Sequence, residues 1–203
     1  MEKPDFDSHL KETVSAKIET AITNAIPRDK LFKLEDELDE LGKSKNLEAY
    51  EREDEIEREL MASCVVAETI VEFKEVLIQV GKMYNKTEDW AEDLLAHENA
   101  HANVGEAVGY EVKGYIVLFS KDNAGRIYSQ PAVFSRSNRD WNTVEKAMKN
   151  IVMYEAPLKY GEVMSDGDIE MAERAHLKLK LFGKVDPASV DRVKNELGDI
   201  WVD

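Results

Sequence analysis

Two histidines four residues apart, His97 and His101, restrict the fold of this chain more than any other feature. They lie in a stretch whose apolar residues recur at alternating steps of four and three, which indicates a helix with both histidines on its apolar face. Residues four apart on a helix lie one above the other, so both imidazoles can bind one tetrahedral zinc ion. Glu98 completes the pattern His-Glu-x-x-His, in which the glutamate takes a proton from the attacking water of a zinc hydrolase.

A site of this kind needs a third protein ligand and an open position for water. Glu106 would face away from His101, because five residues along a continuous helix correspond to a rotation of about 140°. His176 lies in a charged stretch, which favours a surface or interface histidine. Asp168, at the predicted start of a later helix, is the better candidate, although carboxylates at such positions often act only as helix caps.

The histidine segment also resembles a known family. Residues 96–104, Ala-His-Glu-Asn-Ala-His-Ala-Asn-Val, resemble the His-Glu-Ala-Gly-His-Ala segment of the protease domain of FtsH-type metalloproteases, which are membrane-anchored AAA enzymes. A predicted strand (112–119), an apolar helix (144–154) and the segment 165–172 follow in the family's order, so the resemblance covers residues 86–182, a little under half of the chain. The segment 165–172 looks like the family's Gly-Ala-x-Asn-Asp-Ile/Leu-x-x-Ala segment, whose aspartate completes the zinc site.

The resemblance implies that His97, His101 and Asp168 bind zinc, with Glu98 as the general base of peptide-bond hydrolysis. In the family, an edge strand lies beside the cleft, which makes the strand at 112–119 a predicted docking edge for an extended peptide.

The chain also departs from the family's pattern. Asn99 and Ala100 replace the usual Ala-Gly, and the family's Gly-Gly-Arg-Ala-Ala-Glu region is barely recognisable, so no functional residue is assigned from it. No Gly-x-x-x-x-Gly-Lys-Ser/Thr loop occurs, and charged residues interrupt the apolar stretch 70–80, which cannot span a bilayer. We therefore expect a stand-alone, soluble relative without the ATPase, acting on unfolded or flexible polypeptides.

The composition limits which partners and which cellular compartment can be expected. The formal net charge of −15 disfavours nucleic acid, whose phosphates would be repelled, and also anionic membrane surfaces. The single cysteine, Cys64, excludes an intramolecular disulfide and is most simply a small buried apolar residue. Because no N-terminal signal sequence is visible, we expect a cytoplasmic protein.

The predicted organisation is an acidic helical extension (1–60) followed by a zinc metallopeptidase domain (61–203). We expect the first 85 residues to be wholly helical, with a solvated helix or a linker at 47–60 and one long helix at 61–84. The extension can cover the site, form a homo-oligomer or complete the core, and the residues do not decide among these roles.

The predicted fold class is mainly α (α+β), a helical bundle with a zinc-site helix and a small β-hairpin. The leading function is zinc-dependent peptide hydrolysis. Two alternatives remain open: a zinc-binding but inactive scaffold or regulatory protein of the same fold, and a metal-free helical interaction protein whose histidines lie in the core.

Overall fold

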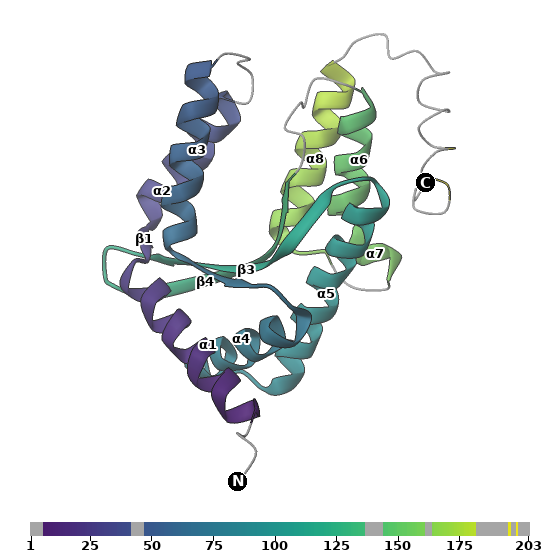
Figure 1. The fold of residues 1–203 in the computed structure, drawn as a ribbon. Helices are drawn as coiled ribbons and strands as arrows, with labels where there is room; N and C mark the ends of the chain where they lie inside the picture. The colour runs from purple at the N-terminus through teal and green to yellow at the C-terminus, as the bar shows by residue number, and fades with distance from the viewer. Residues whose placement is uncertain are drawn as a thin grey trace. The chain divides into compact units, whose positions relative to one another are not determined.

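The computed structural model describes residues 6–41, 47–136, 144–160 and 164–181, together with Asn195 and Gly198 (Figure 1). Most of these residues are helical, and a small mixed sheet accounts for the strands, which confirms the predicted α+β class. Among the helices described, none is both long and apolar enough to cross a membrane. In chain order the elements are α1 (Phe6–Thr23), β1 (Ile26–Pro27), α2 (Arg28–Leu41), α3 (Leu47–Ala62), β2 (Cys64–Ala67), α4 (Ile70–Met83), α5 (Glu88–Ala107), β3 (Glu111–Lys121), β4 (Ile127–Arg136), α6 (Val144–Tyr154), α7 (Ala156–Lys159) and α8 (Asp166–Leu181).

Contacts within the chain divide it into two compact units. The first consists of Met1–Leu95 and Gly114–Phe134, and the second of Ala96–Lys113 and Ser135–Asp203. Helix α5 and strand β3 each contribute residues to both units. The boundary near residue 60 and the role of the acidic N-terminal helices stay predictions.

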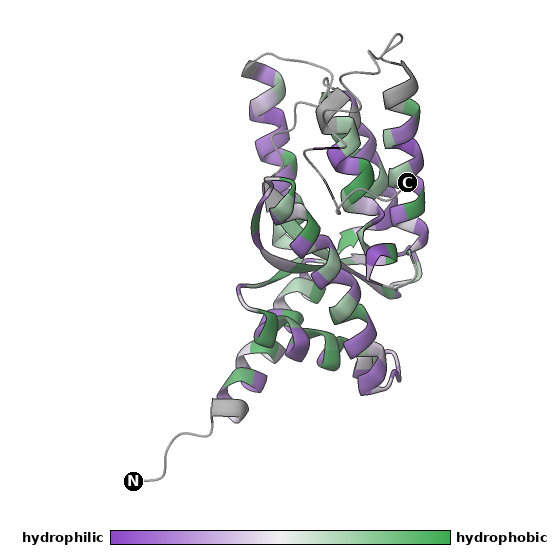
Figure 2. Ribbon diagram, turned by 90° about the vertical axis from the view of Figure 1, so that its right-hand side faces the viewer, coloured by the Kyte–Doolittle hydropathy of each residue, from purple (hydrophilic) through white to green (hydrophobic). Residues whose placement is uncertain are grey.

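In the first unit, helices pack in pairs: α1 lies against α4, and α2 lies against α3 (Figure 1). Most of these helices carry one hydrophobic and one hydrophilic face (Figure 2). The leucines of α2 recur at helical spacing, and Leu31 and Leu34 form a buried cluster with Ile26 and Ile56. Ile56, on the charged helix α3, is fully buried, so α3 is a packed helix rather than a linker.

The sheet is built around β3, to which the three other strands are hydrogen-bonded. β2 runs antiparallel to β3 with Cys64 opposite Leu118 and Ala67 opposite Tyr115, while β1 runs parallel to it. β4 follows β3 after a short turn and pairs with it, as predicted for a hairpin. Residues 115–118 are already paired with β2, so the prediction that this stretch offers a free edge to a peptide is wrong.

The prediction of an entirely helical segment at 1–85, with one long helix at 61–84, is also wrong. Helix α3 ends at Ala62, and the chain enters the sheet as β2 before α4 begins. Val65 and Val66 are β-branched and favour an extended backbone. Thr69 then caps α4, because its hydroxyl accepts a hydrogen bond from the Glu72 backbone N–H at 3.1 Å.

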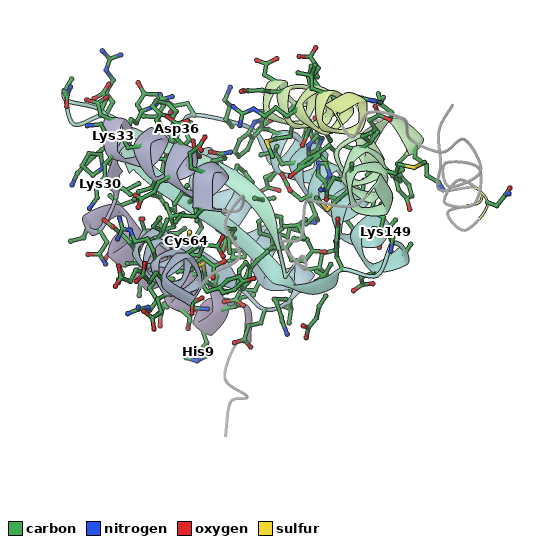
Figure 3. All side chains as sticks on the ribbon, turned by 90° about the horizontal axis from the view of Figure 1, so that it is seen from above. His9, Lys30, Lys33, Asp36, Cys64 and Lys149 are labelled. Carbon is green, nitrogen blue, oxygen red and sulfur yellow. The ribbon has the colours of Figure 1, made fainter. Side chains whose placement is uncertain are left out.

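Cys64 begins strand β2 and is partly buried (Figure 3). Its Sγ donates a weak hydrogen bond to the carbonyl of Leu60 at 3.3 Å. Burial raises the pKa of the Cys64 thiol to about 12, so the thiol stays protonated at neutral pH. Cys64 is thus a structural residue, close to the sequence expectation but less completely buried.

The core of the second unit joins the later part of α5 to α6. Ala100 and Val104 on α5 and Val108 just after its end recur every four residues and pack against Met148 and Val152 of α6. α6 in turn lies side by side with α8 (Figure 1). This packing holds three helices together around the His-Glu-x-x-His segment.

Candidate metal centre

The two histidines lie on one face of α5, as the sequence predicts. α5 begins at Glu88 and continues unbroken past His101. The imidazole rings stand edge to face with their centroids 4.9 Å apart, and the two Nε2 atoms are 3.3 Å apart. Because neighbouring Ala100 and Val104 are anchored in the core, this turn of the helix has a fixed orientation within the unit.

The third member of the group comes from α8. Asp168 lies in the first turn of that helix, with Oδ2 2.9 Å from His97 Nε2 and Oδ1 3.2 Å from His101 Nε2. The side chains of His97, His101 and Asp168 are 12%, 10% and 13% exposed, so the group is largely but not completely shielded from water. One ligand atom from each of the three residues lies within 4.8 Å of the others, and the group could hold a metal ion.

A backbone carbonyl fixes the tautomer of His101. Its Nδ1 lies 2.7 Å from the carbonyl oxygen of Met153, near the end of α6. A carbonyl oxygen can only accept a hydrogen bond, so Nδ1 carries the proton and donates it. In the neutral ring, Nε2 then has a lone pair that is directed at Asp168 and His97. In metal sites, a hydrogen bond at one ring nitrogen commonly orients the other nitrogen of the histidine toward the metal in this way.

The spacing of the donor atoms can be compared with that of a zinc site. Zn–N and Zn–O bonds of about 2.0–2.1 Å at tetrahedral angles place neighbouring ligand atoms about 3.3 Å apart. The Asp168 carboxylate lies 2.9 Å from His97 through Oδ2 and 3.2 Å from His101 through Oδ1, and the two histidine nitrogens are 3.3 Å apart. Each contact is close to the spacing of neighbouring zinc ligands, so the three side chains could hold a small divalent cation together.

Without a cation, the Nε2 side of His101 lies next to the negative charge of Asp168. When His101 donates Nδ1–H to Met153, its neutral Nε2 would direct a lone pair at the carboxylate of Asp168. Protonation of His101, a hydrogen bond donated by the Nε2–H of His97, or a cation between the groups would each reduce this repulsion. A metal ion is thus one of the ways in which the arrangement can be neutralised.

The pKa shifts follow from the same contacts. Burial acts to lower the pKa of His101, but its hydrogen bond with Asp168 and the charges of Asp168 and Glu98 outweigh burial, so the pKa is raised. Burial acts to raise the pKa of Asp168, yet hydrogen bonds to His101 and His97 hold the pKa well below its ordinary value. Asp168 is therefore an anion at every ordinary pH, as a metal ligand must be.

Glu98, the predicted base, lies one position after His97 on α5 and is 6% exposed. Its charge contributes to the raised pKa of His101, so the carboxylate lies within electrostatic reach of the histidines. It is not a member of the group of three ligand atoms. Glu98 is therefore not counted among the metal ligands.

The two weaker ligand candidates lie outside this group. Glu106 is exposed near the end of α5. His176 is on α8 with its side chain 47% exposed, and its Nε2 lies 3.1 Å from Glu155 Oε1, which matches the predicted surface histidine.

Two contributors to the site carried no assigned role in the sequence analysis. No sequence pattern could have identified the carbonyl of Met153, because every residue has a backbone carbonyl. Only the packing of the helices decides which carbonyl reaches His101. Ser165 was detectable, since Ser165 and Asp168 are spaced as the first and last residues of a capping box.

Comparisons with known protein families, with curated proteins and with solved structures give no match to this chain. The family resemblance of residues 86–182 therefore stays a prediction.

Proposed function

We propose that this chain is a zinc-dependent peptidase in which His97, His101 and Asp168 hold the metal and Glu98 is the general base. The observation that carries the proposal is the convergence of two imidazole nitrogens and a carboxylate at separations of 2.9–3.3 Å, next to a buried glutamate. Two histidines and one carboxylate with an open fourth position form a recurrent catalytic zinc set.

Zinc, when bound, would lower the pKa of water toward about 7 and polarise a peptide carbonyl. The chain's own residues supply the remaining functions. Glu98 would accept the proton of the attacking water and pass it to the amine of the departing peptide. Asp168 and the two histidines would keep the ion in a largely shielded setting, where electrostatic interactions are stronger than in bulk water.

The substrate class that we propose is unfolded or flexible polypeptide. The sequence contains no nucleotide-binding Gly-x-x-x-x-Gly-Lys-Ser/Thr loop, so these residues offer no means of unfolding a compact domain with ATP. The FtsH-type resemblance of residues 86–182 agrees with peptide-bond hydrolysis and belongs to the same proposal.

The proposal is tested by comparing the wild type with Glu98→Gln on an unfolded casein-like substrate, with zinc content measured on the same samples. An amide cannot accept the water proton, so E98Q should keep zinc and fold while losing hydrolysis. Glu106→Gln is the matched control, because it makes the same chemical change at an exposed position of the same helix.

Three results would count against the proposal. Equal hydrolysis by the wild type and E98Q would remove Glu98 from the role of base. Loss of zinc in E98Q would assign Glu98 to coordination. Zinc binding without hydrolysis on any unfolded substrate would favour the inactive scaffold.

A further inference from the structure

We propose that Ser165 is a positioning residue of the metal centre, which fixes the carboxylate of Asp168 for coordination through a reciprocal capping box. This inference rests on the proposed zinc site and extends it to a residue that cannot itself be one of the three ligands.

The contacts between Ser165 and Asp168 run in both directions. Asp168 Oδ2 accepts hydrogen bonds from the Ser165 hydroxyl at 2.6 Å and from the Ser165 backbone N–H at 3.1 Å. In return, the Asp168 backbone N–H donates to Ser165 Oγ at 3.1 Å. This is the arrangement of a capping box, with Ser165 as the N-cap of α8 and Asp168 three residues later.

An ordinary capping box uses its acidic residue only to satisfy the helix end. Here the same carboxylate also faces two imidazole nitrogens, at 2.9 Å from His97 and 3.2 Å from His101. Both capping hydrogen bonds fall on Oδ2, so they define the rotation of the carboxylate plane and thereby the position of Oδ1 toward His101. The same hydrogen bonds therefore cap α8 and orient Asp168, the third ligand.

Orientation of this kind has a measurable consequence. A carboxylate with free rotation must lose that freedom when it binds a metal, whereas Asp168 is already held. Loss of a second partner of a metal ligand typically weakens metal affinity by about 10–100-fold. Ser165 is exposed to solvent, and water can partly replace its hydroxyl. We therefore expect its removal to weaken Zn²⁺ affinity by about 10-fold, at the lower end of this range.

The experiment measures Zn²⁺ affinity of the full chain by competition with a chromogenic chelator. Ser165→Ala removes the hydroxyl and weakens the cap. Ser165→Gly removes the hydroxyl but keeps a residue that is acceptable at an N-cap, which separates orientation of Asp168 from helix stability. Ser165→Thr restores a hydroxyl in the same place and should recover affinity.

Thr69→Ala is the matched control. Thr69 is also an exposed N-cap hydroxyl, accepting from the Glu72 N–H at 3.1 Å, while Glu72 Oε2 accepts from the Glu68 N–H at 3.0 Å. This cap starts α4 in the first unit, and none of its residues belongs to the metal-binding group. T69A should lower stability without changing Zn²⁺ affinity.

A second readout reports the coordination geometry directly. Co²⁺ in place of zinc gives visible absorption bands whose intensity depends on the arrangement of the ligands. S165A and S165G should shift or weaken these bands, whereas S165T and T69A should preserve them. A purely structural cap would change thermal stability but leave the bands of the folded protein unchanged.

The outcomes separate this inference from the proposed function. If the wild type binds zinc and S165G binds it equally tightly with the same Co²⁺ spectrum, Ser165 is only a cap and the inference is wrong. If the wild type binds neither metal, the zinc site fails and this inference fails with it. Weakened affinity in S165A and S165G, rescue in S165T and no change in T69A would establish the positioning role.

Discussion

The Nδ1–H of His101 donates to the carbonyl of Met153 at 2.7 Å, a contact that joins α5 to the end of α6 across 52 residues of sequence. It directs the Nε2 lone pair of His101 at Asp168. Because the acceptor is a backbone carbonyl, the contact depends on the packing of α6 rather than on the side chain of residue 153. The packing of apolar helices thus decides which nitrogen of His101 is available to a metal.

Removal of a ligand should abolish stoichiometric zinc. Replacing either His97 or Asp168 with alanine leaves two donors, which should weaken zinc binding by at least about 10-fold and lower metal content after dialysis. In the wild type, in contrast, the free energy of unfolding should increase by about 2.7 kcal/mol when the zinc concentration is 100 times the dissociation constant for zinc.

His176→Ala provides the matched control for this change, because His176 is a half-exposed histidine outside the group. It should leave zinc content unchanged. Metal content measured by atomic emission, together with thermal unfolding with and without added zinc, gives the answer. Wild-type protein that carries no metal and gains no stability from zinc would contradict the assignment of all three ligands.

The metal-free site should make stability depend on pH. The pKa of Asp168 is lowered in the folded protein, so its contribution is present above its unfolded pKa of about 4 and is lost as pH falls through the folded value. The pKa of His101 is raised, so its contribution is present below about 6.5 and is lost as pH rises through the folded value. Both contributions are therefore present together between about pH 4 and 6.5.

Zinc should reverse the upper part of this dependence. Protons compete with the metal for His101, so affinity increases as pH rises and the stabilisation by zinc should grow between about pH 6 and 8. Melting temperatures with chelator and with zinc, measured at several pH values, provide the test. In Asp168→Asn the metal-free decline should begin at lower pH, since the charge that raises the His101 pKa is gone. An unchanged profile in this variant would contradict the assigned cause.

Local sequence signals predicted the parts of the site that lie on single helices. The four-residue spacing placed His97 and His101 on one face of a helix, and the start of a later helix was predicted near Asp168. Asp168 was the preferred third ligand among three candidates, and the family resemblance strengthened that choice without a local signal for its approach to the histidines. Residues 71 positions apart have no local rule that brings them together, because their distance depends on the packing of α6 against α5 and α8.

The sheet was the part of the fold that local patterns identified least well. β2 consists of four residues between two helices, and its apolar run is compatible with a buried helix as well as with a strand. Its extended conformation is stabilised by pairing with β3 more than 40 residues later, including Val65 opposite Val117. The same pairing covers residues 115–118, which belong to the strand 112–119 that the sequence predicted as a docking edge.

A partly buried hydrogen bond should contribute to the stability of the second unit. The Tyr110 hydroxyl donates to Oδ1 of Asn150, a residue that is 4% exposed in α6, and Tyr110 packs on the cluster joining α5 to α6. Tyr110→Phe removes the donor but keeps the ring, leaving a buried acceptor unsatisfied. We expect a loss of about 1–3 kcal/mol in the free energy of unfolding.

Tyr128→Phe is the control for this change, because the Tyr128 hydroxyl donates to Asp122 at the surface and water can replace it. Its expected cost is below about 0.5 kcal/mol. Urea titrations followed by circular dichroism provide both values. An equal loss of unfolding free energy in the two variants would mean that the Tyr110–Asn150 hydrogen bond stabilises the protein no more than a surface hydrogen bond does.

Substrate folding should limit hydrolysis by the full-length chain. The proposed ligands are only 10–13% exposed, so a peptide must reach a largely shielded site, and an extended segment can do so more readily than a folded surface. We expect cleavage of an unfolded casein-like protein and little cleavage of a stable folded domain. A destabilised variant of that domain should be cleaved in proportion to its unfolded population, about 10-fold faster for each 1.4 kcal/mol of destabilisation when unfolding is fast relative to cleavage. Cleavage rates followed by electrophoresis, with E98Q as the blank, measure this relation. Rapid cleavage of the stable domain at a rate independent of its stability would contradict a requirement for unfolded chains and would point to recognition of a folded surface.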